Sequence, residues 1–272
     1  MSAARAAALL ACCTLALVSC SGEDAAGQPE AQASAEPHPP CRPTAFENVP
    51  LTLCTADPAE NRILTALAPG GDTPYRDLSA YAASRPSGAP QVAFAMNGGM
   101  FDDDGKPIGY FVEGGERLHS LNRSGGPGNF HMLPNGVFFG TGGKWEVRTT
   151  EDFFAHVEKR PEFGTQSGPM LVIDGELHPQ IAPDGESLRI RNAVGVDDAG
   201  RAQFVISNEP ISFGKLARFY RDVLKVKNAL FLDGTVSSLW SPETGRLDTG
   251  IPIGPLIVVE KRAKARQEKA AS

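Results

Sequence analysis

The sequence has no excess of positive charge and few large aromatic side chains. Its 26 Lys and Arg are outnumbered by 32 Asp and Glu, which gives a formal net charge of −6. Nucleic-acid binding needs clustered Lys and Arg, so no nucleic-acid partner is expected. Only 2 Trp and 4 Tyr are present, against 29 Gly and 22 Pro. This composition excludes a coiled coil and a collagen-like fibre, and it favours many turns and short strands.

The standard local signatures of several enzyme classes are also missing. There is no phosphate-binding loop with Gly-Lys-Ser/Thr, no Gly-x-Ser-x-Gly turn, no His-Glu-x-x-His and no Cys-x-x-Cys. The histidines of residues 119–178 lie far apart at no metal-ligand spacing. We therefore expect no cofactor and no metal site, and a metal would need oxygen ligands.

No apolar run is long enough to span a bilayer, and a short one lies near the N-terminus. Arg5 precedes this run over residues 6–18, which is the arrangement of an export signal. The run ends in Leu17-Val18-Ser19-Cys20, which resembles the lipobox of bacterial lipoproteins. Residues 1–19 are therefore predicted as a lipoprotein signal peptide and Cys20 as the lipidated residue. The alternative is an ordinary export signal with an incidental cysteine.

The lipobox predicts a location in the bacterial cell envelope, on the periplasmic face and tethered by acyl chains. Ser21 is not an inner-membrane retention signal, which favours the outer membrane. Residues 20–40 have no apolar periodicity and are predicted as a disordered linker. Cys41 and Cys54 would lie in an oxidising compartment, where a disulfide is expected. Two free buried thiols are the alternative.

Residues 41–260 read as one domain, followed by a basic C-terminal tail over residues 261–272. Apolar patterning predicts helices over Tyr75–Ser84, Thr150–Lys159 and Phe213–Val223. Strands are predicted at residues 51–55, 63–68, 92–96, 109–113, 136–139, 145–148, 170–173, 193–196, 203–206, 229–232, 237–240 and 256–259. The expected fold is α+β (α/β mixed), a single domain with a mixed, mainly antiparallel β-sheet core and a few packed helices.

Four polar segments, three of them rich in glycine, lie beside apolar strands. The first is Asn97-Gly98-Gly99, and the second contains Ser167 and Gly168. Glycine lets a ligand approach the backbone closely, so these segments are candidate binding loops. Asn-Gly is also a frequent hairpin turn, and that reading stays open for the first segment.

The third and fourth segments carry opposite charges. Arg191 stands directly before a strand that reads as buried, where a cation needs an anionic partner. A guanidinium suits a carboxylate or phosphate in two-point contact, and an internal ion pair with an Asp is the alternative. Asp233 follows an apolar run and is followed by Gly234 and three hydroxyl residues. This grouping suits a polar ligand, although Asp-Gly is again a turn sequence.

In this order the segments resemble the phosphodiester glycosidase domain family, which occurs in bacterial envelope proteins and in the animal lysosomal uncovering enzyme. The likeness is to the bacterial branch, often labelled exopolysaccharide-related, and runs from about Phe46 to Val259. It rests on residues 97–101, 128–130, 134–138, 166–171, 191–195 and 232–238. The resemblance implies an α/β fold around a mixed sheet, with these loops gathered at one site. In the uncovering enzyme the family chemistry removes a sugar from a sugar-phosphodiester.

An envelope-anchored hydrolase of a sugar-phosphodiester is therefore expected, with a carbohydrate or sugar-phosphate substrate. The catalytic residues are predicted as Asp233, the nucleophile or base at the anomeric carbon, Arg191, the phosphate clamp, and Asn97. A phosphate leaving group is a weak base, so one carboxylate plus charge stabilisation would suffice. Substrate contacts are assigned to Gly98, Gly99, Asp102, Ser167, Gly168, Asn192, Gly234, Thr235, Ser237 and Ser238.

Further possibilities stay open at this point. Asp102, Glu113 and Glu209 are reserve acids among which the sequence does not choose. One alternative function is a non-catalytic polysaccharide- or glycan-binding lipoprotein that assists exopolysaccharide or cell-wall assembly. Another is a hydrolase of a different phosphodiester linkage.

Overall fold

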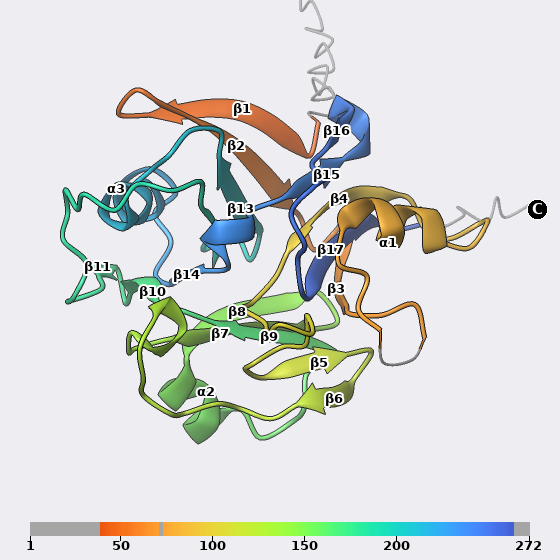
Figure 1. The fold of residues 1–272 in the computed structure, drawn as a ribbon, viewed down its shortest axis with the longest axis horizontal. Helices are drawn as coiled ribbons and strands as arrows, with labels where there is room; N and C mark the ends of the chain where they lie inside the picture. Colours follow the sequence, from red (N-terminus) through yellow and green to blue (C-terminus); the bar gives the residue numbers. More distant parts are fainter. Residues whose placement is uncertain (1–38, 71–72, 264–272) are drawn as a thin grey trace, which may run out of the picture. The chain divides into compact units, whose positions relative to one another are not determined.

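The computed structural model describes residues 39–70 and 73–263. Within these residues the chain forms three β-sheets and three α-helices (Figure 1). The predicted signal peptide, the lipidation of Cys20, most of the linker and most of the basic tail lie outside the described residues. Among the described helices, none combines the length and the apolar content needed to cross a membrane.

The largest sheet has seven strands in the order β1-β2-β13-β12-β14-β10-β11. Its strands are β1 (Cys41–Phe46), β2 (Val49–Ala56), β13 (Ala202–Ser207), β12 (Asn192–Val196), β14 (Ala229–Phe231), β10 (Met170–Ile173) and β11 (Glu176–Leu177). Its β1–β2 hairpin pairs Cys41 with Cys54, and the two cysteines form a disulfide. The predicted disulfide is therefore confirmed.

Two five-stranded sheets complete the described structure. The β4 sheet consists of β16 (Arg246–Leu247), β15 (Leu239–Ser241), β4 (Val92–Asn97), β17 (Leu256–Lys261) and β3 (Asn61–Ala66), in that order. The β9 sheet consists of β6 (Glu116–His119), β5 (Phe111–Glu113), β9 (Phe163–Ser167), β7 (Gly136–Thr141) and β8 (Lys144–Thr149), in that order.

The helices cover the outer faces of the sheets (Figure 1). Helix α1 (Leu78–Ser84) packs on the β4 sheet, α2 (Thr150–His156) on the β9 sheet, and α3 (Phe213–Arg218) on the seven-stranded sheet. A π-helical turn over Phe219–Val223 continues α3. The hydroxyl of Thr149 accepts a hydrogen bond from the Asp152 amide, so α2 begins at the capping sequence.

The central core lies between the inner faces of all three sheets. Phe204 of the seven-stranded sheet contacts Phe94 of the β4 sheet, with ring centroids 5.3 Å apart. It also contacts Phe138 of the β9 sheet at 5.6 Å. The strands β4 and β13 are buried along their whole length because helices cover their other face. This explains why their sequences are nearly continuous apolar runs.

The two faces of strand β12 contribute side chains to two different hydrophobic clusters. Val194 belongs to the central core, while Ala193 belongs to the cluster under α3. Side chains alternate between faces along a strand, so Asn192 points toward the central core and Arg191 toward α3. This alternation determines which polar residues can meet at the end of the sheet.

The structure corrects several sequence predictions. Every strand pair in the described part of the chain is antiparallel, so the expected mixed sheet is wrong, and the fold is sheet-rich with few helices. Helix α1 begins at Leu78 because Asp77 caps it, accepting from the Ala80 amide at 2.6 Å. The helix predicted over Phe213–Val223 is α-helical only to Arg218, and Val223 at the end of the π-helical turn is 52% exposed.

Candidate active site

Arg191 and Asp233 flank neighbouring strands at one end of the seven-stranded sheet, since Arg191 directly precedes β12 and Asp233 follows β14 by two residues. Ala193 of β12 pairs with Phe231 of β14, and the Leu232 amide donates to the Asn192 carbonyl at 3.1 Å. The pairing of β12 with β14 ends at Ala193 and Phe231, so Arg191 and Asp233 lie just beyond the paired residues, where the Asp233 backbone is still extended with φ −142° and ψ 98°.

The Asp233 carboxyl group has no cationic partner. Within residues 39–70 and 73–263 no Lys, Arg or His nitrogen lies within ion-pair distance of it. Its Oδ1 accepts one hydrogen bond, from the Thr235 amide at 3.3 Å. Burial raises the pKa of Asp233 to about 6, and the Thr235 hydrogen bond opposes this shift. The group can therefore change its protonation state near neutral pH.

The backbone around Asp233 is held by two asparagine side chains. The Asp233 amide donates to Asn192 Oδ1 at 3.1 Å, and its carbonyl accepts from Asn97 Nδ2 at 3.1 Å. The two asparagines also bind each other, with Asn192 Nδ2 donating to Asn97 Oδ1 at 2.8 Å. Ser167 Oγ donates to the carbonyl of Leu232, one residue earlier.

These three holding residues come from three different sheets. Asn97 ends β4, Asn192 begins β12 and Ser167 ends β9. All three are fully or almost fully buried. The structure thus brings Asn97, Ser167 and Asn192 to Asp233, but to its backbone and that of Leu232 and away from the carboxyl group.

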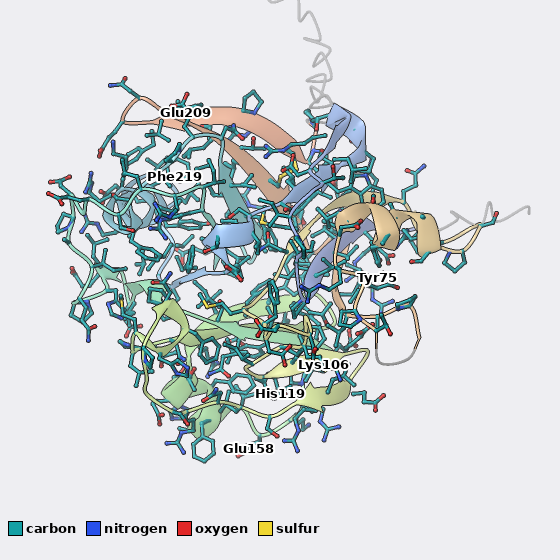
Figure 2. All side chains as sticks on the ribbon, in the orientation of Figure 1. Tyr75, Lys106, His119, Glu158, Glu209 and Phe219 are labelled. Carbon is teal, nitrogen blue, oxygen red and sulfur yellow. A yellow bond between two sulfur atoms is a disulfide. The ribbon has the colours of Figure 1, made fainter. Side chains whose placement is uncertain are left out.

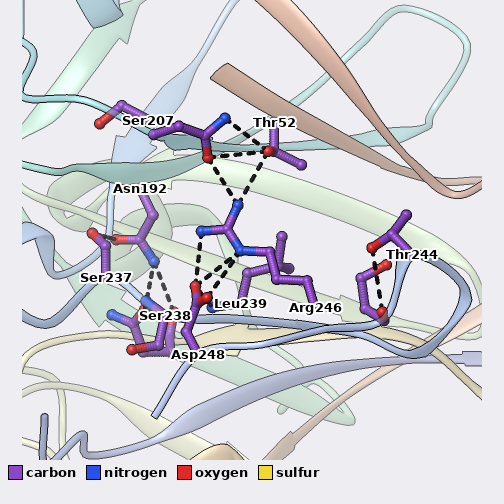
Figure 3. A network of polar contacts seen from close by, with 12 residues as sticks. Thr52, Asn192, Ser207, Ser237, Ser238, Leu239, Thr244, Arg246 and Asp248 are labelled. Atoms are coloured by element: carbon purple, nitrogen blue, oxygen red, sulfur yellow. Dashed lines mark hydrogen bonds and ion pairs between the residues drawn. The ribbon is translucent and has the colours of Figure 1, made fainter. Parts of the chain in front are cut away.

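The hydroxyl residues after Asp233 divide into buried and accessible ones. Ser238 is buried, and its hydroxyl donates to the Val236 carbonyl at 2.9 Å. The half-buried Ser237 hydroxyl lies 3.3 Å from Asn192 Oδ1 (Figure 3). Thr235 is exposed beside the Asp233 carboxyl group. Gly234 is confined by packing, because a Cβ there would lie 2.7 Å from the Phe231 ring.

Arg191 is a buried cation without an anion. Its Nε donates to the Ile211 carbonyl at 2.9 Å, and its Nη2 donates to the carbonyl and hydroxyl oxygens of Ser187 at 3.0 and 3.2 Å. The guanidinium carbon lies 3.6 Å from the centre of the Phe213 ring. In the described part of the chain no carboxylate pairs with it, and Nη1 has no acceptor. Burial, with a contribution from Arg189, lowers the pKa of Arg191 to about 10.

Some backbone amides near the site already donate to an acceptor, and others do not. The Gly98 amide donates to the Pro255 carbonyl at 2.7 Å, and the Gly99 amide donates to Thr165 Oγ1 at 3.1 Å. Gly99 also packs so closely against the Gln166 carbonyl that a Cβ could not fit. The amides of Gly168 and Gly234 have no acceptor among residues 39–70 and 73–263.

The acids considered beside Asp233 lie elsewhere. Asp102 is exposed and accepts from the Lys106 amide in a surface turn. Glu113 is half-buried on β5, where burial raises its pKa and its carboxylate accepts from the Leu67 amide. Glu209 is exposed near the β1–β2 hairpin (Figure 2). In the described residues, no group of three His, Cys, Asp or Glu is arranged to hold a metal ion.

The Arg191 guanidinium is surrounded by Ser187, Ile211 and Phe213, none of which is predicted from the sequence. Ile211 and Phe213 lie at and just after the antiparallel bridge between Arg189 and Ile211. Ser187 precedes Arg191 by four residues. Nothing in the local pattern marks a loop serine or a phenylalanine as part of a cation's shell.

Removing Asn192 is expected to loosen the Asp233 loop. Asn192→Ala deletes hydrogen bonds to Asn97 and to the Asp233 amide and leaves their buried partners unsatisfied. We expect the free energy of unfolding to fall by about 2–4 kcal/mol. Asn208→Ala, at an exposed asparagine next to the end of β13, should cost less than about 1 kcal/mol. Denaturant titration measures both, and equal costs would contradict the holding role.

Comparison with known proteins identifies the family of this chain. Residues 90–268 match the protein family described as phosphodiester glycosidase. The chain is 38% identical over 150 residues to the uncharacterized protein YigE of Escherichia coli (strain K12), a stretch covering 55% of this chain. The matched stretch spans 58% of that relative's length.

Solved structures also resemble the chain. The catalytic domain of zebrafish N-acetylglucosamine-1-phosphodiester alpha-N-acetylglucosaminidase, auto-inhibited by its pro-peptide, shares the fold with a TM-score of 0.57 and 17% identity over 82% of each chain. A putative exported protein from Burkholderia pseudomallei has a TM-score of 0.48 and 11% identity, over 78% of this chain and 74% of its own. Because the family match covers more than half of its residues, the chain belongs to the phosphodiester glycosidase family.

Proposed function

We propose that this protein hydrolyses a sugar-phosphodiester, with Arg191 binding the phosphate and Asp233 acting at the anomeric carbon. The observation that carries the proposal is that two unpaired charged groups lie beyond the same end of two neighbouring strands. Among the described residues, Arg191 is a cation without an anion that directly precedes β12, and Asp233 is a carboxyl group without a cation that follows β14 by two residues. A buried charge is costly unless it is paired, and a phosphodiester anion would supply the missing partner of Arg191.

The chemistry follows from the leaving group. The Asp233 carboxylate attacks the anomeric carbon to form a glycosyl ester that water then hydrolyses, or it takes a proton from a water that attacks the anomeric carbon directly. In either case the bond from the anomeric carbon to oxygen breaks, and its electron pair stays on the phosphate oxygen. Arg191 stabilises the charge that grows there, so no acid is needed to protonate the leaving oxygen. The amides of Gly168 and Gly234 are further donors for phosphate oxygens.

The name of the zebrafish enzyme contains N-acetylglucosamine-1-phosphodiester, so a phosphodiester of N-acetylglucosamine 1-phosphate is the first substrate to test. Hydrolysis in ¹⁸O-labelled water should place the label on the released sugar and none on the phosphate. Label on the phosphate would indicate cleavage of the P–O bond and contradict the proposal. Tight glycan binding without turnover would favour a binding lipoprotein.

The pH dependence of activity is expected to follow Asp233. Only the carboxylate can act as nucleophile or base, and burial raises its pKa to about 6. Below pH 6 we expect kcat/KM to rise about tenfold per pH unit, and above pH 7 to be constant while Arg191 stays protonated. Rates measured from pH 4 to 8 test this. A rate that falls above pH 6 would make Asp233 an acid.

We propose in addition that the domain is anchored to the bacterial cell envelope through lipid on Cys20. The support is the apolar run that ends in Leu17-Val18-Ser19-Cys20. Wild-type protein expressed in a bacterium should sediment with membranes, and Cys20→Ser should move to the soluble fraction. Equal membrane association of both forms would contradict the anchor.

A further inference from the structure

A small pocket opens beside the shell of Arg191. Its volume is about 90 Å³. A cavity of about 10–15 Å³ by the same measure holds one water molecule, so the pocket has room for several non-hydrogen atoms. Its walls are mainly apolar and come from three segments, with Met132, Ile181, Ala182 and Phe213 among the lining residues.

Two residues belong both to this pocket and to the Arg191 shell. Ser187 lines the pocket and accepts from Arg191 Nη2 through its carbonyl and its hydroxyl. Phe213 lines the pocket and stacks on the guanidinium. Ser187 and Phe213 thus connect the pocket to the Arg191 guanidinium, which does not itself line the pocket.

The pocket is separate from the place where the sugar must lie. In the proposed function the sugar's anomeric carbon is next to Asp233, and no residue of the 233–238 loop lines the pocket. A phosphodiester has a second ester substituent, which leaves with the phosphate. An apolar pocket beside the cation favours an apolar substituent there, since each buried methylene contributes about 0.8 kcal/mol.

Resting on the proposed function, we propose that the substrate is a sugar-1-phosphoryl alkyl ester and that this pocket binds the first carbons of the alkyl group. In the reaction the bond between the anomeric carbon and oxygen breaks, and its electrons remain on the phosphate. Water supplies a hydroxyl group to the sugar. The bond between phosphorus and the alkyl oxygen stays intact, so the second product is an alkyl phosphate.

The test uses this second product, so that it does not depend on the sugar or on turnover. Binding of methyl, propyl and 2-hydroxyethyl phosphate to the full-length protein is measured by calorimetry. Propyl phosphate has two more methylenes than methyl phosphate, and at roughly fourfold each it should bind about 15-fold more tightly. The 2-hydroxyethyl group has the same number of non-hydrogen atoms as propyl and should give no such gain.

Two variants test whether the preference for propyl phosphate over methyl phosphate arises from the pocket. Met132→Gln keeps the length of the side chain but makes the wall polar, and it should reduce the propyl preference to less than about threefold. Leu133→Gln changes a neighbouring side chain that is 42% exposed and does not line the pocket, so the preference should remain. Thermal unfolding establishes that both variants are folded.

Equal binding of the three phosphates, or a propyl preference that survives in Met132→Gln, would overturn the inference. Absence of binding by any of them would overturn it as well. Failure of sugar release with a propyl preference intact would instead refute the proposed hydrolysis alone.

Discussion

Replacing Asp233 with asparagine is expected to give a protein that is inactive and more stable than the wild type at pH 7.5. Burial raises the pKa of Asp233 from 3.8 to about 6 in the folded protein. At pH 7.5 the carboxylate is ionised in both states, and the folded state bears the cost of the buried charge. This difference corresponds to about 3 kcal/mol. Asparagine carries no charge and keeps an oxygen that can accept from the Thr235 amide.

The stability difference should depend on pH in a defined direction. Below pH 3.8 both states of the wild type bind the proton, so the two proteins should be similarly stable. Between pH 3.8 and 6 the unfolded wild type releases its proton while the folded form keeps it, so wild-type stability falls as pH rises. Above pH 6 the difference is complete. Urea titrations at pH 3.5, 5 and 7.5 measure the trend.

The loss of activity follows from the same substitution. An amide can neither attack the anomeric carbon nor accept a proton from water, so kcat/KM for the sugar-phosphodiester should fall by about 10³-fold or more. Asp198→Asn, at an exposed carboxyl group, should change neither stability nor rate. A variant at Asp233 that is active at the wild-type rate would remove it from the mechanism.

Replacing Arg191 with alanine is expected to lower kcat/KM by about 10²–10³-fold, the usual effect of removing one group that stabilises a growing oxyanion. Arg191→Lys should recover part of the loss, because it keeps the charge without the planar two-point geometry. The substitution to alanine also leaves the Ile211 and Ser187 carbonyls without their donor.

The matched control for this experiment is Arg189→Ala. Arg189 is exposed, and among the described residues its side chain donates only to the neighbouring Leu188 carbonyl, so loss of this side chain should leave kcat/KM unchanged. Inhibition by inorganic phosphate gives a second measurement, since Arg191→Ala should weaken it and Arg189→Ala should not. Unaltered phosphate inhibition in Arg191→Ala would place the anion site elsewhere.

Apolar strands of this fold could be predicted from the sequence, but β9 could not. Residues 163–167 read Phe-Gly-Thr-Gln-Ser, with no apolar alternation, yet β9 lies buried between β5 and β7. Its side chains replace apolar packing with hydrogen bonds. Thr165 accepts from the Gly99 amide, and Gln166 accepts from the amides of Tyr110 and Asn122. Such a strand is stabilised by partners distant in sequence, which a local pattern does not contain.

The segments of the candidate site could be predicted from the sequence, but the contacts between them could not. The segments around Asn97, Arg191 and Asp233 were recognised from their composition and their order along the chain. Whether Asn97 contacts substrate stays a prediction, and the structure shows that its side chain binds the Asp233 carbonyl, Asn192 and the Ser238 amide. That arrangement depends on strand register and on sheet packing. Neither is encoded in a short motif, so the sequence alone does not separate a positioning amide from a ligand contact.

The segment around Asp233 depends on all three sheets, because each sheet supplies one of the residues Asn97, Ser167 and Asn192 that hold it. Since β4, β9 and β12 each supply one residue that fixes the segment around Asp233, this segment is ordered only when all three sheets have assembled. Local opening of any one sheet would release it. Exchange of the Asp233 amide hydrogen with solvent should therefore be at least as fast as the opening of the least stable of the three sheets, and no fragment lacking one sheet should retain the site.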